Sequence, residues 1–286
     1  MTELGTVAVL GLGLVGGSLA RDLAARGVRV VGYDRDPAAV DAARRAGAVD
    51  VAADESLTHL AAADVVVLAV PVTAAPALLE RARPHLAAAR LVTDVGSTKR
   101  TIVACAERLG LGARFVGSHP LAGDHRSGWA ASRAGLFAGA RTYLCPAAGA
   151  GADSVSLARA LWAAVGAHTE VVDAAAHDAR LALTSHLPQL ASSAVARVLA
   201  AARVERAELG PGGRDVTRLA GSSPEVWAAI AVDNAAPLAA ALRALAAELE
   251  AVRAAVERGD AAALLEALRA AREWFERDAA RGTRHE

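Results

Sequence analysis

Two histidines lie in short motifs that favour a reactive site. His119 occurs in GSHPLAG, directly after an apolar run that predicts a strand, and His186 occurs in TSHLP. A neutral imidazole can accept the proton of a substrate hydroxyl near neutral pH. We therefore expect His119 to act as a general base, with a structural histidine as the alternative. At His186 a buried, hydrogen-bonded histidine is a stronger alternative.

A glycine-rich loop near the N-terminus predicts a dinucleotide site, because it follows a strand and opens a helix. Its residues are Gly11, Leu12, Gly13, Leu14, Val15 and Gly16. A pyrophosphate would lie close to the glycine backbone at the helix N-terminus. Asp34 ends the second predicted strand, where its carboxylate would bind the adenosine ribose and repel a 2′-phosphate. The loop thus favours NAD over NADP, although Arg35 weakens the preference because a guanidinium could bind that phosphate.

Three further motifs also follow predicted strands. They are Ala69-Val70-Pro71, Asp94-Val95-Gly96-Ser97 and Ser118-His119-Pro120. In a doubly wound sheet the carboxyl ends of the strands line the ligand crevice, so these motifs and the glycine loop converge on one edge. The residues that we expect to contact the dinucleotide there are Ala69, Val70, Pro71, Asp94 and Gly96.

A pair of arginines suggests an anion site. Arg214 and Arg218 are four residues apart, which places them on one face of a helix. Asp215 could neutralise one of them, and the other could bind a carboxylate in bidentate geometry. A solvated helix face explains the pair equally well. Trp227, taken alone, is typical of a core residue.

Alternating strands and helices are expected to position these motifs. Apolar, β-branched runs predict strands at 6–11, 28–34, 65–70, 91–95 and 114–117, and such runs are typical of a parallel sheet buried on both faces. Residues 141–145, 154–165 and 169–172 predict a closing strand–helix–strand unit. From Asp173 only helices are expected, over 173–206, 223–234, 237–258 and 260–281.

The pattern predicts an α/β fold with two domains. A Rossmann-type doubly wound parallel sheet is expected over residues 1–172, followed by an all-α domain over residues 173–286. The long helices rich in Ala and Leu have more apolar surface than one small domain can bury. We therefore expect a homodimer formed through the helical domain.

Composition excludes several classes of protein. The 31 basic and 31 acidic side chains balance, so neither nucleic acid nor a membrane is an expected partner. Two cysteines cannot make a disulfide scaffold, and no N-terminal run resembles a signal peptide, so a cytoplasmic location is expected. No spacing of histidine, cysteine or carboxylate residues is typical of a metal site.

One lysine, Lys99, stands among 30 arginines in a chain that also contains 76 alanines. A GC-rich genome accounts for the abundance of alanine and arginine. Lys99 follows Ser97 by two residues, close to the predicted site. We expect a position where the bulkier guanidinium does not fit, with chance as the alternative.

Taken in order, these motifs resemble the prephenate/arogenate dehydrogenase family of tyrosine biosynthesis. The resemblance covers nearly the whole chain and is carried by GLGLVGGSLA, AVP, DVGSTK, GSHPLAG, TSHLPQL and GGRDVTRLAGSSPEVW. It implies an NAD-dependent oxidative decarboxylation of prephenate to 4-hydroxyphenylpyruvate by a homodimer.

The resemblance also implies roles for single residues. His119 is similar to the family's catalytic histidine, and Ser97 to the serine that orients it. Arg218 is similar to the arginine that binds a substrate carboxylate, and His186 to a histidine that lines the substrate pocket. Trp227 is similar to a tryptophan that reaches the site from the partner subunit.

One departure from the family's pattern bears on the substrate. Many members carry an acidic residue where this chain has His125, and an acid there would recognise the ammonium group of arogenate. We therefore expect prephenate, although Asp124 could supply the missing charge. Two alternatives stay open: 4-amino-4-deoxyprephenate of secondary metabolism as the substrate, and a catalytically silent NAD-binding sensor. Hydroxyacid dehydrogenases usually rely on a lysine in the helical half, and this chain has none there.

Overall fold

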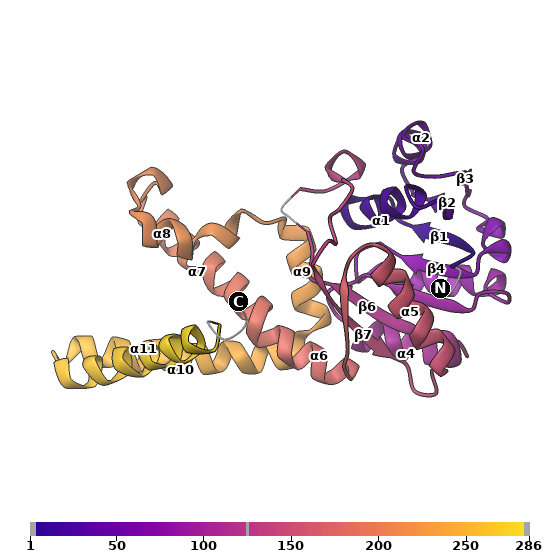
Figure 1. Cartoon of the computed structure of the whole chain (residues 1–286). Helices are drawn as coiled ribbons and strands as arrows, with labels where there is room; N and C mark the ends of the chain where they lie inside the picture. The colour runs from indigo at the N-terminus through magenta and orange to yellow at the C-terminus, as the bar shows by residue number, and fades with distance from the viewer. Residues whose placement is uncertain (1–3, 124–125, 283–286) are drawn as a thin grey trace. The chain divides into compact units, whose positions relative to one another are not determined.

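The structure is a computed structural model that describes residues 4–123 and 126–282 (Figure 1), with the backbone alone for 278–282. These residues fall into two compact units, divided between Ala235 and Ala236. The sequence pattern predicts the boundary at 172/173 instead, where the last predicted strand ends. The division by contacts comes later because α6 (Ala174–Leu181), the first helix after the last strand, packs against the α/β part.

Five parallel strands form the larger sheet, in the order β3-β2-β1-β4-β5. The strands are β1 (Thr6–Leu10), β2 (Arg29–Tyr33), β3 (Val51–Ala52), β4 (Val65–Leu68) and β5 (Leu91–Asp94). The helices that follow them are α1 (Leu14–Ala24), α2 (Pro37–Arg45), α3 (Ala75–Ala82) and α4 (Arg100–Arg108). The strand order reverses between β1 and β4, which is where doubly wound sheets bind ligands. The predicted Rossmann-type architecture is thus confirmed.

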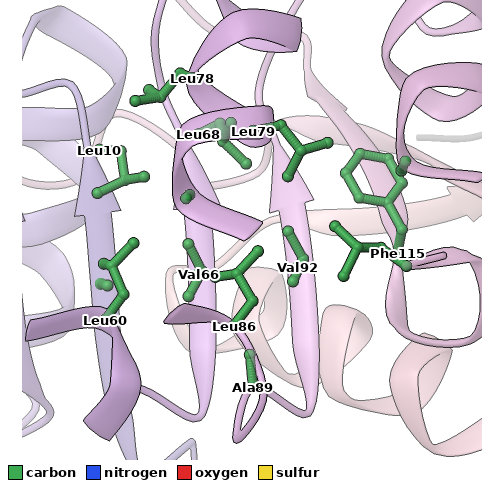
Figure 2. Close-up of a cluster of buried hydrophobic side chains, with 14 of the residues drawn as sticks. Leu10, Leu60, Val66, Leu68, Leu78, Leu79, Leu86, Ala89, Val92 and Phe115 are labelled. Atoms are coloured by element: carbon green, nitrogen blue, oxygen red, sulfur yellow. The ribbon is translucent and has the colours of Figure 1, made fainter. Parts of the chain in front are cut away.

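Both faces of this sheet are buried, as its β-branched runs predict. Alternate residues enter separate apolar clusters, so that Leu10 and Val66 belong to one and Val9 and Val67 to the other. Figure 2 shows the first cluster, in which leucines from the segments between strands cover the sheet and Phe115 packs beside its last strand. This packing fixes the strand ends that carry the predicted motifs.

A second sheet contains β6 (Val116–Pro120), β7 (Arg141–Pro146) and β8 (His168–Val171). β6 pairs antiparallel with β7, which corrects the expectation of a wholly parallel arrangement. The connection between them spans residues 121–140, and the only helical element in its described part is a short 3₁₀ turn, Trp129–Ala131, so the helix that usually joins parallel strands is not found there. β7 and β8 are parallel and are joined by α5 (Ala152–Ala164), as predicted.

The predicted helix over 173–206 is divided by a π-helical turn. α6 leads into the π turn Ala182–His186, and α7 (Leu187–Ala201) follows. Pro188 explains the break, because it has no N–H to donate to the carbonyl four residues earlier. π turns of this kind often occur at functional sites, and this one ends at His186.

The remaining helices are α8 (Pro211–Val216), α9 (Pro224–Asp233), α10 (Ala235–Glu257) and α11 (Ala261–Gly282). Within the described residues, no single helix is long and apolar enough to cross a membrane, although α9 and α10 taken together reach that length and composition.

Candidate active site

A pocket of about 640 Å³ lies beside the ends of β5, β6 and β7. It brings together five residues that were predicted from separate motifs: Val15, Ser97, His119, His186 and Trp227. The other lining residues are Val95, Pro120, Leu121, Ala122, Gly123, Arg141, Tyr143, Arg180, Leu181, Thr184 and Ser185. The wall thus combines apolar side chains with two imidazoles, two guanidinium groups, a phenol and three hydroxyls.

His119 is joined to two residues that the sequence motifs did not identify. Its Nδ1 lies 2.9 Å from Nε2 of His177, and Nδ1 of His177 lies 2.8 Å from Oδ1 of Asp178. All three side chains are buried. Burial is the main reason that the pKa of His119 lies well below its ordinary value of 6.5, so the imidazole is neutral at neutral pH.

Asp178 is also tied to the start of α4. The backbone N–H of Lys99 donates to its Oδ1 over 2.8 Å, and that of Arg100 donates to its Oδ2 over 3.0 Å. Burial alone would raise the pKa of Asp178, but the hydrogen bonds from His177 and from these two backbone groups lower it. The carboxylate is therefore ionised, and it serves as the N-terminal cap of α4.

His186 faces the same pocket and is also neutral. Nδ2 of Asn234 lies 2.8 Å from the carbonyl oxygen of Asp178 and 3.1 Å from Nδ1 of His186. Since a carbonyl only accepts, Asn234 must be the donor and Nδ1 of His186 the acceptor. Burial lowers the pKa of His186 to about 4, so the ring is neutral and carries its hydrogen on Nε2. His186 is therefore a hydrogen-bond donor at its free nitrogen.

The cations that line the pocket are Arg141 and Arg180, which the sequence motifs did not indicate. Each is about half exposed and lies 3.7 Å from a carboxylate oxygen of Glu170. The guanidinium of Arg180 is 5.7 Å from the ring centre of Tyr143, which stands directly opposite His119 in the β6–β7 ladder. Strand pairing places Arg141 and Tyr143 at the pocket, and the packing of α6 on β7 places Arg180 there, so no local pattern could reveal them.

Other predicted substrate residues lie elsewhere. Arg214 on α8 and Arg218 in the turn after it are exposed, and neither lines the pocket. Trp227 was expected from a partner subunit but lines the pocket of its own chain, with its ring 5.9 Å from that of His186. His125 lies outside the described residues.

The glycine loop has the shape that a dinucleotide needs. Gly11 has a φ of +104°, and a Cβ at Gly16 would lie 2.0 Å from the carbonyl oxygen of Gly11. α1 begins after Gly13 with no side chain capping its first turn, so the free N–H groups there suit phosphate oxygens. The residues of this chain therefore fit a pyrophosphate at the start of α1.

The two predicted acidic residues near the loop have different surroundings. Asp34 directly follows β2 and is half-buried, and its Oδ2 accepts a hydrogen bond of 2.7 Å from the N–H of Leu12. Asp94 was expected to contact the dinucleotide but is buried, with Lys99 against its carboxylate. Asp94 also accepts a hydrogen bond of 2.8 Å from the N–H of Gly96, so its role is to shape the loop after β5.

The remaining residues predicted to contact the dinucleotide lie in two places. Ala69, Val70 and Pro71 follow β4, and the carbonyl of Ala69 packs closely against Gly11. Arg35 is exposed beside Asp34.

Comparison with known sequences identifies the family. The profile of the prephenate dehydrogenase nucleotide-binding domain matches residues 19–171, and that of the prephenate dehydrogenase dimerization domain matches residues 173–270. The chain belongs to the prephenate dehydrogenase family. The resemblance drawn from the motifs is thus confirmed.

Named relatives in this family match nearly the whole of this chain. Prephenate dehydrogenase of Bacillus subtilis (strain 168) is 32% identical over 279 residues, covering 94% of this chain and 75% of the relative. The structure of Synechocystis arogenate dehydrogenase matches with a TM-score of 0.82 and 28% identity, covering 95% of this chain and 99% of that one. Prephenate dehydrogenase from A. aeolicus, in complex with hydroxyphenyl propionate and NAD⁺, matches with a TM-score of 0.86 and 28% identity over 96% and 98% of the two chains.

Lys99 holds together the strand ends on which the pocket is built. Its side chain is fully buried, and its ammonium contacts Asp94 and donates to the carbonyl oxygen of Ser118 over 2.8 Å. Its Cδ also lies close to Gly117, where an added Cβ would be 3.2 Å away. The space around Lys99 thus agrees with the expectation that a larger guanidinium does not fit.

Replacement of Lys99 by methionine should lower the free energy of unfolding by about 3–5 kcal/mol, because Asp94 is left as a buried charge without its partner. Urea denaturation at fixed protein concentration measures this. The double variant Lys99→Met with Asp94→Asn is the control and should recover part of the loss, since a neutral amide needs no cation. Lys99→Met with wild-type stability would contradict this role of the ion pair.

Proposed function

We propose that this chain is an NAD-dependent prephenate dehydrogenase that converts prephenate to 4-hydroxyphenylpyruvate and CO₂. The observation that carries the proposal is a neutral, buried His119 in a pocket with two guanidinium groups, beside a glycine loop fitted to a dinucleotide. Membership of the family supports it. When bound, NAD⁺ supplies the acceptor for the hydride that leaves the substrate.

His119 is proposed to act as the general base and then as the general acid. Its imidazole accepts the proton of the ring hydroxyl while the C–H bond at the same carbon breaks. Loss of the ring carboxylate as CO₂ then leaves its electron pair in the ring, and the proton returns to the same oxygen as the aromatic phenol forms. A general base of this kind contributes about 10²–10⁴-fold to the rate. Ser97 and the Nε2–H of His186 line the same pocket and are proposed to orient the substrate.

Arg141 and Arg180 are proposed to bind the carboxylates of prephenate, which is a dianion. Charge-assisted bonds between guanidinium and carboxylate are strong and directional. Among the described lining residues there is no aspartate or glutamate to pair with the ammonium group of arogenate. The charges of the pocket therefore favour prephenate, and arogenate is the second candidate because a solved relative is named arogenate dehydrogenase.

The chain is further proposed to act as a homodimer through residues 173–286. The matched dimerization-domain profile supports this assignment. α11 adds an independent observation, since Leu268, Trp274 and Phe275 are each more than two-thirds exposed in the single chain. Exposed apolar side chains in such number mark a surface that another molecule covers.

The proposed function is tested by measuring NADH or NADPH formation with prephenate, arogenate and 4-amino-4-deoxyprephenate, each with NAD⁺ and NADP⁺. We expect the highest kcat/KM for prephenate with NAD⁺, because no described lining residue is a carboxylate that would pair with an amino group and because Asp34 disfavours a 2′-phosphate. A higher kcat/KM for arogenate or the amino analogue would overturn the substrate, and no turnover with any of them would overturn the function.

Arg180→Gln should raise KM for prephenate by about 10-fold or more, because a hydrogen bond to a charged group contributes about 1.5–3 kcal/mol. KM for NAD⁺ should stay unchanged, since Arg180 lies on α6 and not in the glycine loop. Arg159→Gln, on α5 and outside the pocket lining, is the matched control. If both variants bind prephenate like the wild type, Arg180 is not a substrate residue.

A further inference from the structure

The two ring nitrogens of His119 have different surroundings. Nδ1 faces His177, so Nε2 is the nitrogen that remains for a substrate in the pocket. A neutral imidazole carries its hydrogen on one nitrogen only, and only the other can accept a proton. Whether His119 can act as a base therefore depends on which nitrogen is protonated.

We propose that His177 and Asp178 are positioning residues that hold His119 with hydrogen on Nδ1 and a free lone pair on Nε2. This inference rests on the proposed function, in which His119 is the base. It assigns a role to two buried residues outside the motifs that identified the site.

The direction of the hydrogen bonds is set at Asp178. An ionised carboxylate only accepts, and Asp178 accepts from the backbone N–H groups of Lys99 and Arg100 as well as from His177. Nδ1 of His177 must therefore be the donor over the 2.8 Å contact. In a neutral His177 this leaves Nε2 as an acceptor.

The hydrogen-bond direction at His119 follows from that at His177. Since Nε2 of His177 accepts, Nδ1 of His119 must donate across the 2.9 Å that separates them. The rings of His119 and Tyr143 both pack edge-on against His177, with centroids 5.1 Å and 5.4 Å from it. This packing holds the orientation of His177, so Nε2 of His119 is left unprotonated toward the pocket.

The arrangement also supports the charged form that appears during reaction. When Nε2 of His119 takes up a proton, its Nδ1–H stays bonded to His177, whose other nitrogen is bonded to a carboxylate. A histidine oriented by a buried acid works in the same way in the serine protease triad, where the acid fixes the tautomer and stabilises the imidazolium. Here a second imidazole stands between the base and the acid.

Two substitutions at His177 distinguish its contact with Asp178 from its contact with His119. An asparagine places its amide near the position of Nδ1 and can still bond Asp178, but it does not reach His119. A glutamine places its amide near the position of Nε2 and can still accept from His119. If His177 matters only for packing, the two variants should behave alike.

Steady-state kinetics with prephenate and NAD⁺ test the proposal. His177→Asn should lower kcat by about 10²-fold, within the contribution of a general base. His177→Gln should have a kcat several-fold above that of His177→Asn, because its amide oxygen still accepts from His119, but below the wild type, because it no longer bonds Asp178. KM for both substrates should change little in either variant, and His119→Asn gives the lower limit of kcat. Equal kcat for the Asn and Gln variants, at comparable thermal stability, would overturn the proposal.

Nitrogen NMR of enzyme labelled with ¹⁵N-histidine reads the tautomer directly and needs no turnover. In the wild-type protein without substrate we expect a protonated Nδ1 and an unprotonated Nε2 for His119, whose signals are assigned by their absence in His119→Asn. A protonated Nε2, as would follow if both nitrogens of His177 carried hydrogen, would overturn the proposal. Failure of the proposed function looks different, because the wild-type enzyme would then not turn over prephenate whatever the tautomer.

Discussion

The site depends on the hydrogen bonds that the buried carboxylate of Asp178 accepts. This carboxylate accepts from the first backbone N–H groups of α4, which follows the last strand of the larger sheet, and from the ring of His177 on its own helix. One buried charge thus joins the α/β part to the helical segment after β8. Because the positive end of the α4 dipole faces it, the carboxylate stays ionised without a cationic side chain.

A second buried charge, the ammonium of Lys99, holds the loop between β5 and α4. The ammonium of Lys99 bonds Asp94 at the end of β5 and the carbonyl of Ser118 on β6, while the backbone of Lys99 bonds Asp178. The loop that carries Ser97 is therefore held at both ends, and Ser118 directly precedes His119. Burial raises the pKa of Asp94, and the ammonium beside it opposes that effect. The positions of Ser97 and His119 thus depend on the hydrogen bonds of two buried charged groups, Asp178 and Lys99, as well as on the apolar core.

Local patterns were sufficient to predict the glycine loop, the ends of β4 and β5 and the choice of His119, because each depends on a short run of sequence. The end of β6 was predicted too early, since the strand continues through Ser118, His119 and Pro120, which were expected to follow it. The residues that no pattern revealed depend on tertiary pairing. Tyr143 stands opposite His119 only because β6 and β7 run antiparallel, and Arg180 enters the pocket only because α6 packs on β7.

The role of His177 also could not be predicted from local sequence. Its motif is a plain His-Asp pair inside a predicted helix, and its function appears only once that helix lies beside α4. The substrate cations were predicted at Arg214 and Arg218 by their spacing, yet the pocket of the chain is lined by Arg141 and Arg180. Helical spacing shows which side chains share a face, but it does not show what that face meets.

The most direct test of the account compares Asp178→Asn with Asp173→Asn. Both aspartates cap a helix by accepting two backbone N–H groups. Asp173 caps α6, and its carboxylate bonds Ala175 and Ala176, whereas only its backbone carbonyl bonds His177. The account predicts that Asp178→Asn lowers kcat for prephenate by about 10²-fold or more, because an amide no longer fixes the tautomer of His177 and His119. Asp173→Asn should keep both kcat and thermal stability close to those of the wild type, because asparagine caps a helix about as well as aspartate. Unchanged kcat in Asp178→Asn, or an equal fall in both variants, would contradict the account.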